Sequence, residues 1–426
     1  MSELAESPLA AGDRNFSVSE ARAAIAAALQ PITETLTVPL ALALGRVLAQ
    51  DVISPIDVPA HDNSAMDGYA FASSDLQADA PTLLQAVGTV MAGAPHVGRI
   101  AAGQALRIMT GAVMPAGLDT VVPHELCRVE GQQVQIAAGV MRAGENRRRQ
   151  GEDLTLGRPA LQAGRLLKPA DLGLIASLGI TQVVVVRRLR VALFSTGDEL
   201  RNAGQPLAPG CIYDSNRYSL MGALQRLGMD VIDLGLVPDN PAALRATLAA
   251  AVVEADAVLT SGGVSMGDAD HVRDVLAQLG EVAFWKVAMR PGRPFAFGPL
   301  RRPDAQPPAW LFALPGNPVA ALVTFYVFVR EALLQLAGAA PQPLPVLQAR
   351  CTTAIRKRPG RTEFQRAVVE PAPAPEGGWQ VRLTGSQGAG VLRSMSEANA
   401  LLVLRHEQGS VAAGEMVDVW LFDGLS

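Results

Sequence analysis

Carboxylates and small residues gather in the stretch from Val258 to Asp270. Ala257-Val258-Leu259 is typical of a short buried strand, Ser261-Gly262-Gly263 of a tight turn, and Asp268 can cap a following helix. A strand, a glycine-rich loop and a helix N-terminus present several backbone N–H groups at one point, which suits a phosphate or another anion. The carboxylates of Asp268 and Asp270 would repel an anion unless a cation lay between them. The stretch therefore indicates either a site for a metal and a phosphate or an ordinary strand–helix loop.

Two further loops carry residues of the same kind. One is Ser195-Thr196-Gly197-Asp198-Glu199-Leu200, and the other is Leu314-Pro315-Gly316-Asn317-Pro318, in which the asparagine can cap a helix that begins at the second proline. Each could be a simple turn. The carboxyl ends of parallel strands meet at one edge of a sheet, so the three loops would lie together there. The carboxylates gathered at that edge would be Asp198, Glu199, Asp239, Asp268 and Asp270.

This chemistry favours a hard cation. Carboxylates without Cys or His suit Mg²⁺, which binds through one or two carboxylates together with a substrate phosphate. Lys286, Arg290 and Arg293 can balance the phosphate charge, or they can form structural salt bridges instead.

The elements that must position these loops alternate between strand and helix from about Val183 to Gly338. Such alternation predicts a parallel sheet wrapped by helices. The predicted strands include Arg190–Ser195, Met229–Leu236 and Trp310–Leu314, and the predicted helices are Arg217–Leu227, Pro241–Ala255, Ala269–Leu279 and Pro318–Leu336.

The rest of the chain has a different texture. A capping box at Ser17-Val18-Ser19-Glu20 begins a helix that ends before Pro31, and we expect further helices at Leu40–Val47 and Leu172–Ser177. Short segments separated by Gly and Pro predict a small β domain that ends near Gly151. Its expected strands include Leu83–Val90, Ala105–Met109 and Gln133–Ile136.

A proline-rich linker follows at residues 341–345, and beyond it Leu401–Leu404 and Met416–Leu421 indicate a small β barrel or sandwich. The fold class we expect is multidomain, α/β plus β. Its domains are a helical linking domain (15–50 and 151–186), a β-rich lid domain (51–150), an α/β domain (187–340) and a C-terminal β-barrel domain (341–426).

Composition limits the function classes. The chain has 426 residues, 49% of them hydrophobic, and a formal net charge of −4, so it is long enough for several domains and has no electrostatic reason to bind nucleic acid. Its three cysteines are far apart, which fits reduced thiols. The acidic N-terminus is unlike a signal peptide, and the longest apolar run, Val319–Val329, is too short to span a bilayer. We expect a soluble cytoplasmic protein.

Five motifs occur in the order of one known family, and they are Asp62-Asn63-Ser64-Ala65-Met66-Asp67-Gly68-Tyr69-Ala70, Arg107-Ile108-Met109-Thr110-Gly111-Ala112, Gly151-Glu152-Asp153, Ser261-Gly262-Gly263-Val264-Ser265-Met266-Gly267-Asp268 and Leu314-Pro315-Gly316-Asn317-Pro318. With them the chain resembles the molybdopterin molybdenumtransferases, the family of bacterial MoeA and the gephyrin E domain. The first motif is highly specific, and the likeness runs from about Ser17 to Phe422.

The resemblance implies a cytosolic homodimer that acts last in molybdenum cofactor assembly. Such enzymes take adenylylated molybdopterin and molybdate, use a divalent cation such as Mg²⁺, release AMP and leave molybdenum on the dithiolene. Their cleft lies between the α/β domain of one subunit and the β-rich domain of the other. A molybdopterin adenylyltransferase would act upstream, and molybdoenzymes or their chaperones downstream.

The resemblance also implies roles for particular residues. Asp67 and Thr110 resemble the catalytic contribution of the partner subunit, whereas Glu199, Asp239 and Asp270 resemble the acidic set around the metal and the pyrophosphate. The implied substrate-binding residues are Ser261, Gly262, Gly263 and Ser265 in the glycine-rich loop, Lys286 and Arg290, Asp153 and Arg148 at the rim of the second subunit, and Pro315 and Pro318 near the site of metal insertion.

Some positions depart from the family pattern. Arg290 and Arg293 stand where lysines are common, which keeps the charge but changes the geometry. Gln150 ends an arginine run that usually continues, and Ala389 replaces a common serine.

Two other readings compete. The α/β core also resembles molybdopterin adenylyltransferases, and gephyrin-type proteins also act as scaffolds. The first motif and the extra β domains favour the molybdenumtransferase, and the chain has no long interaction linker of the scaffold kind.

Overall fold

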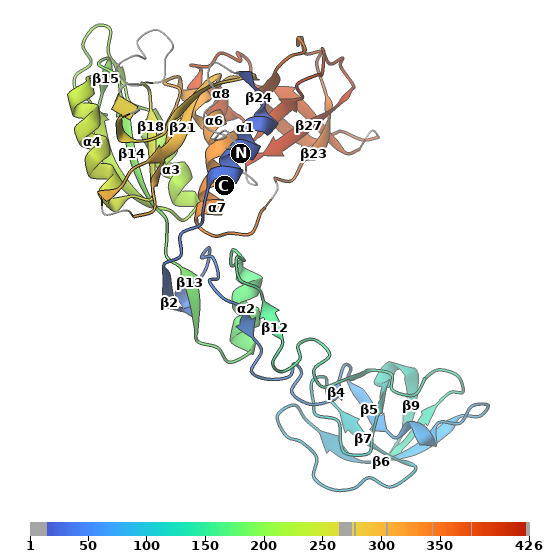
Figure 1. Ribbon diagram of the computed structural model, residues 1–426. Coiled ribbons are helices and arrows are strands. Elements are labelled where there is room, and N and C mark those ends of the chain that lie inside the picture. The colour runs from blue at the N-terminus through green and yellow to red at the C-terminus, as the bar shows by residue number, and fades with distance from the viewer. Residues whose placement is uncertain are drawn as a thin grey trace, which may run out of the picture.

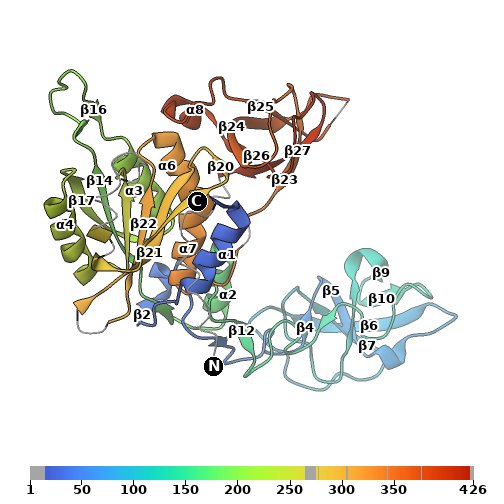
Figure 2. The same ribbon diagram turned by 45° about the horizontal axis from the view of Figure 1, so that its top comes forward.

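The computed structural model describes residues 15–263, 275–276, 278–303, 306–342, 344–375 and 377–422. The molecule is elongated (Figures 1 and 2). A sheet domain and a C-terminal barrel lie side by side at one end, a small linking unit follows, and the β-rich lid domain lies at the far end.

The central sheet has seven strands in the order β1-β19-β21-β22-β18-β14-β17. The predicted parallel arrangement holds for β14 (Arg190–Thr196), β17 (Asp230–Val237), β18 (Ala257–Ser261) and β22 (Ala309–Leu314). The structure adds β21 (Pro294–Leu300), which runs antiparallel to both β22 and β19 (Ala283–Val287). Only residues 288–293 separate β19 from β21, too few for the crossover that a parallel neighbour needs.

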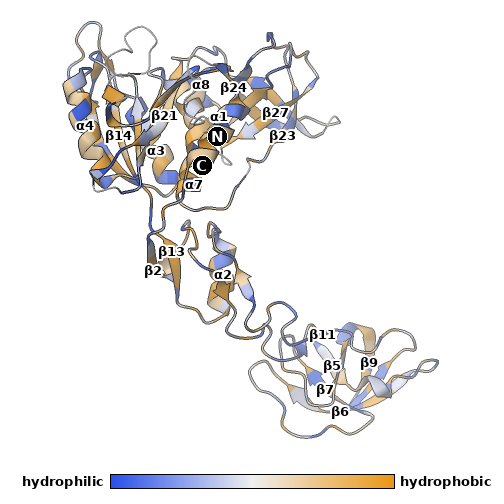
Figure 3. Cartoon of the chain, viewed as in Figure 1, coloured by the Kyte–Doolittle hydropathy of each residue, from blue (hydrophilic) through white to orange (hydrophobic). Residues whose placement is uncertain are grey.

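Two apolar cores cover the two faces of this sheet. Along β14, Leu193 enters one core and Ala192 the other, because successive side chains in a strand point to opposite faces. Strands that are buried on both faces must be almost wholly apolar. Figure 3 shows this apolar colouring along the strands and helices of the domain. The covering helices are α3 (Asn216–Arg226), α4 (Pro241–Glu254), α6 (Pro318–Thr324) and α7 (Arg330–Leu336).

The helices α6 and α7 are continuous through a π-helical turn at Phe325–Val329. The resulting helix, Pro318–Leu336, is long and apolar enough to cross a membrane by length and composition alone. It is longer than the apolar run Val319–Val329 on which the sequence-based expectation rested. Of its most apolar window, 83% is buried inside the protein, as in the core helix of a globular domain.

The N-terminal helix lies in the sheet domain and not in the linking domain to which we assigned it. α1 (Val18–Ala28) has the predicted capping box at Ser17 and Glu20. Its buried Ile25 joins the same core as Phe16. The strand β1 (Asn15–Phe16) also extends the central sheet by pairing with Lys286 and Val287. An amphipathic helix packs wherever an apolar surface is free, and its own sequence does not say where that surface is.

The linking unit is built from two small antiparallel pairs and one helix. These are β2 (Thr35–Pro39) with β13 (Gln182–Val186), β3 (Val52–Ile53) with β12 (Pro159–Leu161), and α2 (Pro169–Ser177). The predicted helix at Leu40–Val47 is wrong, since only a 3-10 turn forms at Leu40–Leu42. Gly45 has a φ of +69° in the left-handed region, which ends a right-handed helix.

The lid domain holds a six-stranded sheet in the order β8-β5-β7-β6-β10-β9, which includes the three predicted strands. The six strands are β5 (Gly68–Phe71), β6 (Thr82–Val90), β7 (Gln104–Ile108), β8 (Thr120–Pro123), β9 (Cys127–Glu130) and β10 (Gln133–Ile136). A short pair, β4 (Asn63–Ser64) with β11 (Arg147–Arg148), lies between this sheet and the linking unit.

The C-terminal domain is a barrel and not a sandwich. Its strands are β23 (Leu347–Cys351), β24 (Thr362–Pro371), β25 (Trp379–Leu383), β26 (Ala400–Leu404) and β27 (Met416–Leu421), with a short helix α8 (Leu392–Glu397). The long strand β24 pairs with both β25 and β26, and this second pairing closes the sheet on itself. A two-residue strand β20 (Met289–Arg290) pairs with β24 and joins the barrel to the sheet domain.

Candidate functional site

Three loops meet at the carboxyl edge of the central sheet, as predicted. The strand register places Ser195 of β14 beside Ser261 of β18, and Ser261 beside Leu314 of β22. The three strands β14, β18 and β22 all end at about this level of the sheet. The loops that follow therefore start as close neighbours, about 5 Å apart from strand to strand.

The middle loop depends on glycine at its first position. Gly262 has a φ of +94°, and a Cβ there would lie 2.3 Å from the carbonyl oxygen of Thr196. Its N–H donates to the carbonyl oxygen of Leu314 at 3.1 Å, and the Ser261 hydroxyl lies 3.3 Å from the carbonyl oxygen of Pro315. The middle loop thus contacts both outer loops through its backbone, which leaves no room for a side chain.

A polar turn beneath the loops was missed by sequence reasoning. The buried Asp214 accepts a hydrogen bond from the Ser195 hydroxyl at 3.1 Å. The Nδ2 of Asn216 donates to the Ser261 hydroxyl and to the carbonyl oxygen of Gly316, at 2.7 Å each. The signal was the polar triplet Asp214-Ser215-Asn216 directly before a helical pattern, at positions where such residues often cap helices.

Arg217 extends this buried network toward the first loop. Its guanidinium donates to Asp214 at 3.2 Å, to Asp233 at 2.6 Å and to the Asn202 side-chain oxygen at 2.8 Å. Burial lowers the pKa of Arg217, but the hydrogen bond and charge of Asp233, with those of Asp214, outweigh it and raise the pKa. Arg217 therefore stays protonated, and its side chain ties the segment after β14 to the strand β17.

The predicted acidic residues approach one another from two loops. The backbone N–H of Asp239, which follows β17, lies 3.4 Å from Oδ1 of Asp198. The Glu199 carboxylate folds back over Gly197, where a Cβ would come within 2.7 Å of its Oε2. Within the part of the chain that the structure describes, no three Asp, Glu, His or Cys side chains lie close enough to hold a metal. Asp268, Asp270 and Ser265 lie outside the described residues.

Lys286 and Arg290, two of the predicted basic residues, lie several strands away from the middle loop, although Lys286 is at the same carboxyl edge of the sheet. Lys286 stands near the carboxyl end of β19, opposite Pro294. Because β21 and β22 lie between β19 and β18, Lys286 is about 14 Å across the sheet from the middle loop. The exposed Arg290 sits on β20 beside the barrel.

The charge of Arg290 acts on a second guanidinium, that of Arg366 in the barrel. Burial, followed by the charge of Arg290, lowers the pKa of Arg366 to about 10. Like charges raise each other's energy unless an anion or a carboxylate lies between them. The junction of sheet domain and barrel therefore holds two guanidinium groups close enough to affect each other, and sequence reasoning did not assign Arg366 to it.

The third loop is covered by the barrel. The N–H of Val319, in the first turn of α6, donates to the carbonyl oxygen of Ala389 at 3.0 Å. Arg366 holds the same barrel loop through the carbonyl oxygen of Gly388 at 2.9 Å. Pro315 and Pro318 thus lie at a contact between domains. The contact uses the backbone of Ala389, so it does not depend on the side chain that departs from the family pattern.

The lid domain brings Asp67 and Thr110 together. Both the N–H and the hydroxyl of Thr110 donate to Oδ1 of Asp67, at 2.7 Å each. These hydrogen bonds, the backbone one first, lower the pKa of Asp67. The carboxylate is exposed at the surface and held in one orientation.

The residues predicted for the rim of the partner's site make hydrogen bonds to residues near them in the same chain. Nε of Arg148 donates to Glu152 at 2.7 Å, and the backbone N–H of Asp153 donates to the carbonyl oxygen of Val58 at 3.0 Å. Gln150, where the arginine run stops, donates through its side chain to Asp57 at 2.9 Å. The side chain of Gln150 therefore has a structural partner in this chain.

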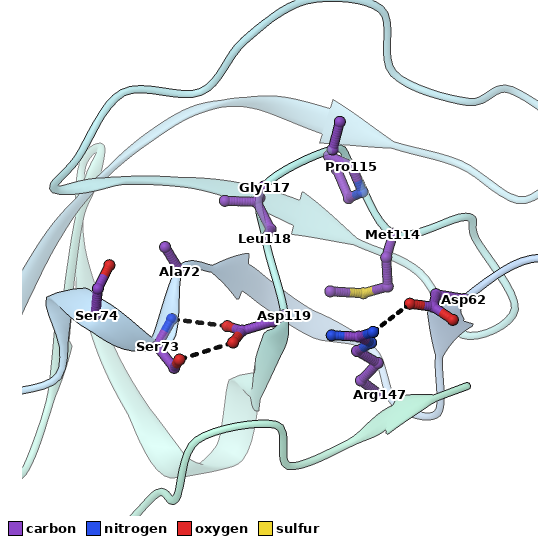
Figure 4. A pocket seen from close by; sticks show the side chains of 11 residues that line it. Asp62, Ala72, Ser73, Ser74, Met114, Pro115, Gly117, Leu118, Asp119 and Arg147 are labelled. Carbon is purple, nitrogen blue, oxygen red and sulfur yellow. Dashed lines mark hydrogen bonds and ion pairs between the residues drawn. The ribbon is translucent and has the colours of Figure 1, made fainter. Parts of the chain in front are cut away.

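A separate cavity opens on the lid domain (Figure 4). It measures about 440 Å³, and its charged lining comes from Asp62, Asp119 and Arg147. Arg147 pairs with Asp62 at 2.5 Å, and Asp119 accepts from the N–H and hydroxyl of Ser73 at 2.7 Å each. Neither member of the Asp67–Thr110 pair lines this cavity.

One chain does not bring its lid residues to its sheet loops. Asp67 and Thr110 belong to the lid domain, and Figures 1 and 2 both show the linking unit between that domain and the sheet. The predicted site residues therefore form two groups within a chain, one at the carboxyl edge of the sheet and one in the lid domain.

Comparisons with known proteins cover almost the whole chain. Residues 16–179 match the model of the MoeA N-terminal region (domain I and II), residues 192–335 that of a probable molybdopterin binding domain, and residues 348–422 that of the MoeA C-terminal region (domain IV).

Individual relatives agree with these matches. The chain is 41% identical to a molybdopterin molybdenumtransferase of Haemophilus influenzae over 96% of this chain and 99% of the relative. It is 39% identical to one from Nostoc sp., over 90% of this chain and 88% of the relative. A crystal structure of the molybdopterin biosynthesis moeA protein of Pyrococcus horikoshii OT3 superposes with a TM-score of 0.79 at 28% identity, and covers 96% of this chain and 100% of that one.

Proposed function

Because the chain belongs to the MoeA family of molybdopterin molybdenumtransferases, we propose that the carboxyl edge of its sheet binds adenylylated molybdopterin together with a divalent cation. Molybdenum cofactor biosynthesis is the function, and the enzyme is a transferase. The matches to MoeA regions on both sides of the molybdopterin binding domain distinguish it from a molybdopterin adenylyltransferase.

The convergence of three tight loops carries this proposal. Ser261, Gly262 and Pro315 come together from different strands at one edge of the sheet. Tight loops at strand ends can present backbone N–H groups to an anionic ligand, although the N–H of Gly262 is itself bonded to Leu314, and the phosphates of the substrate are such ligands.

Molybdate is the second anion of the reaction. Arg290 and Arg366 give the junction of sheet domain and barrel a positive charge. Lys286 adds a third cation at the same edge of the sheet. Guanidinium groups bind tetrahedral oxyanions through paired hydrogen bonds, so this junction is where the proposal puts molybdate.

The donor groups near the first loop fit a hard cation. Glu199 and Asp239 offer carboxylate oxygens, which Mg²⁺ prefers over softer ligands. With Asp270 they form the set that would hold the cation. When bound, a cation neutralises the charge that develops on the bridging oxygen of a pyrophosphate as it breaks. The chain's own loops hold and orient the phosphates beside it.

The proposal includes a homodimer in the cytoplasm. Asp67 is exposed and held in one orientation, yet it is remote from its own sheet loops. A partner chain related by two-fold symmetry can bring an identical lid domain to those loops. A molybdopterin adenylyltransferase would supply the substrate, and molybdoenzymes or their chaperones would receive the product.

The test is AMP release from adenylylated molybdopterin in the presence of molybdate. Chelation of divalent cations is expected to stop it, and Mg²⁺ to restore it. Glu199→Gln is expected to lower the rate about 10²–10³-fold, as for the loss of one electrostatic partner of a transition state, and to raise the Mg²⁺ concentration needed.

Glu254→Gln is the matched control. Glu254 is an exposed carboxylate of the same domain at the end of α4, directly before β18 begins, and thus at the opposite edge of the sheet. It should behave like the unchanged protein. Unchanged turnover and Mg²⁺ dependence in Glu199→Gln would remove this carboxylate from the site. Formation of adenylylated molybdopterin from ATP would favour the adenylyltransferase reading.

A further inference from the structure

The first two residues of α3 bind the middle and third loops at the carboxyl edge of the sheet and the segment that follows the first loop. Asn216 donates to Ser261 in the middle loop and to Gly316 in the third loop. Arg217 donates to Asn202, which belongs to the segment after β14. We refer to Asn216 and Arg217 together as the α3 clamp.

The contacts of Asn216 leave it no donor for a ligand. A side-chain amide has two N–H groups, and both acceptors lie 2.7 Å from Nδ2. The residue is buried, with 8% of its surface exposed. Any influence of this amide nitrogen on the reaction must therefore pass through the two loops that it joins.

Up to Gly263, where the described part of the middle loop ends, few other contacts join the middle and third loops. Ser261 and Gly316 are 55 positions apart in the sequence, so chain connectivity does not set the distance between them. The Ser261 hydroxyl makes a longer contact with Pro315, at 3.3 Å, and Gly262 bonds to Leu314 inside the sheet. Among the described residues, which end at Gly263 in the middle loop, the Asn216 amide thus spans the gap beyond the sheet edge.

The clamp is anchored from below by a buried carboxylate. Asp214 accepts from the backbone N–H of Arg217 at 3.2 Å and from the Ser195 hydroxyl at 3.1 Å. The start of α3 is thereby fixed to β14, the strand that carries the first loop. An anchored donor costs little entropy when it fixes another group, and this is what positioning a site requires.

We propose that Asn216 is a positioning residue for molybdenum transfer. By joining Ser261 to the carbonyl group of Gly316, it sets the spacing of the middle and third loops at the edge of the sheet where the substrate would bind. This inference rests on the proposed function, which puts the substrate at these loops.

The test compares Asn216→Ala and Asn216→Asp with the unchanged protein in the AMP-release assay. Asn216→Asp keeps the volume but replaces both donors by a carboxylate oxygen facing a carbonyl oxygen. A displacement of about 1 Å in a catalytic site can cost ~10²-fold in rate, so kcat/KM is expected to fall by about 10- to 100-fold. The KM for adenylylated molybdopterin is expected to rise in both variants. If either variant does not fold, Asn216→Ser is tested in its place.

Asn399→Ala is the matched control. Asn399 also makes two hydrogen bonds, both to Val369 of the barrel at 2.8 Å, and neither reaches the loops. It should lose some thermal stability and keep its KM. A merely structural Asn216 would behave likewise, since unfolding of a fraction of the molecules lowers kcat in proportion but leaves KM unchanged. Unchanged KM in folded Asn216 variants would therefore overturn the inference.

Two loop variants separate this failure from failure of the proposed function. If Ser261→Ala and Glu199→Gln reduce AMP release while the Asn216 variants do not, the site is at the loops and only the positioning role is wrong. If all of these variants keep full activity, the proposed location of the site is wrong, and the inference falls with it.

Discussion

Among single residues, Asp67 shows how neighbouring groups set the pKa and the orientation of a side chain. Two hydrogen bonds from Thr110 converge on one carboxylate oxygen, and the charges of His124 and Arg107 add to them in lowering the pKa of Asp67. The carboxylate is therefore ionised at neutral pH and restricted in rotation although it lies on the surface.

Thr110→Val tests this arrangement. The variant keeps the shape and the backbone N–H donor but removes the hydroxyl donor, so the pKa of Asp67 is expected to rise toward its ordinary value. AMP release should fall by about 10-fold or more, because a positioned charge in a catalytic site is lost or misdirected. Carboxyl NMR shifts of labelled aspartate across a pH series would show the change. A melting temperature lowered by many degrees, with activity per folded molecule unchanged, would assign Thr110 a purely structural role.

Asp256 is a second residue whose environment sets its charge, here for stability. Burial raises its pKa, but the bidentate hydrogen bonds from Arg187, at 2.6 and 2.9 Å, and that from the N–H of Arg190, at 2.8 Å, outweigh burial and lower it. Arg187 also contacts Glu34 of the linking unit. The pair thus lies where the linking unit joins the sheet domain.

Because of this pair, the free energy of unfolding is expected to fall as the pH becomes acidic. A lowered folded-state pKa contributes stability that is fully present above the unfolded value of about 4 and is lost as the pH falls through the folded value. Asp256→Asn is expected to cost about 3 kcal/mol at pH 7, near the lower end for a broken buried pair, because Arg187 keeps Glu34. It should also flatten the fall of the urea midpoint below about pH 4.

Asp230→Asn is the control for that prediction. Asp230 is 57% exposed in its side chain and lies 3.8 Å from Arg188. An exposed pair of this kind contributes about 0–1 kcal/mol, so the urea midpoint should barely move. An equal loss in the two variants would contradict a special role for the buried pair.

At the scale of elements, the strand ends and the loops after them form a single unit. β18 can end beside β14 and β22 only because Gly262 brings its backbone against the carbonyl group of Thr196. The loop geometry is therefore a consequence of strand pairing and of one residue without a side chain.

Gly262→Ala should distort this unit. The added Cβ would stand 2.3 Å from a backbone oxygen that is fixed in the sheet, so the loop has to move. AMP release is expected to fall by about 10²-fold or more through the displaced loop. Gly228→Ala is the control, because Gly228 also has a positive φ, of +73°, but its nearest atom would be 3.7 Å away. It should cost about 1 kcal/mol of stability and little activity. Equal activity in the two variants would show that the loop tolerates the shift.

At the scale of the whole molecule, the distance between lid and sheet domains is the main feature. The linking unit separates Asp67 from Glu199 in each chain, whereas both residues belong to the site that the proposed function assembles. A homodimer with a shared cleft accounts for this, since each partner would complete the other's site.

Mixed dimers test the shared cleft. Asp67→Ala and Glu199→Ala should each be nearly inactive alone, because each removes one half of every site. A mixed dimer would hold one site with both lesions and one with neither. Random pairing makes about half of the dimers mixed, so roughly a quarter of all sites should be intact after joint refolding. Inactive mixed dimers, verified by mass, would contradict a cleft shared in this way.

The sequence alone determined what depends on neighbours along the chain. The capping box at Ser17, the strands β14, β17, β18 and β22 and the start of the helix at Pro318 follow from spacing and local preference, and they formed within a residue or two of the predicted bounds. The motifs around Asp67 and Ser261 also indicated the family correctly.

Only the tertiary structure decided what depends on residues far apart in the chain. The packing of α1 on the sheet domain, the reversed direction of β21 and the closure of the barrel by β24 all arise from long-range pairing. The Leu40–Val47 segment had a helical pattern, but the left-handed backbone at Gly45 prevailed. Asn216 acts across 45 and 100 positions of sequence. Local preferences are worth tenths of a kcal/mol per residue, whereas burial and pairing with distant partners are worth several, and so they decide the arrangement.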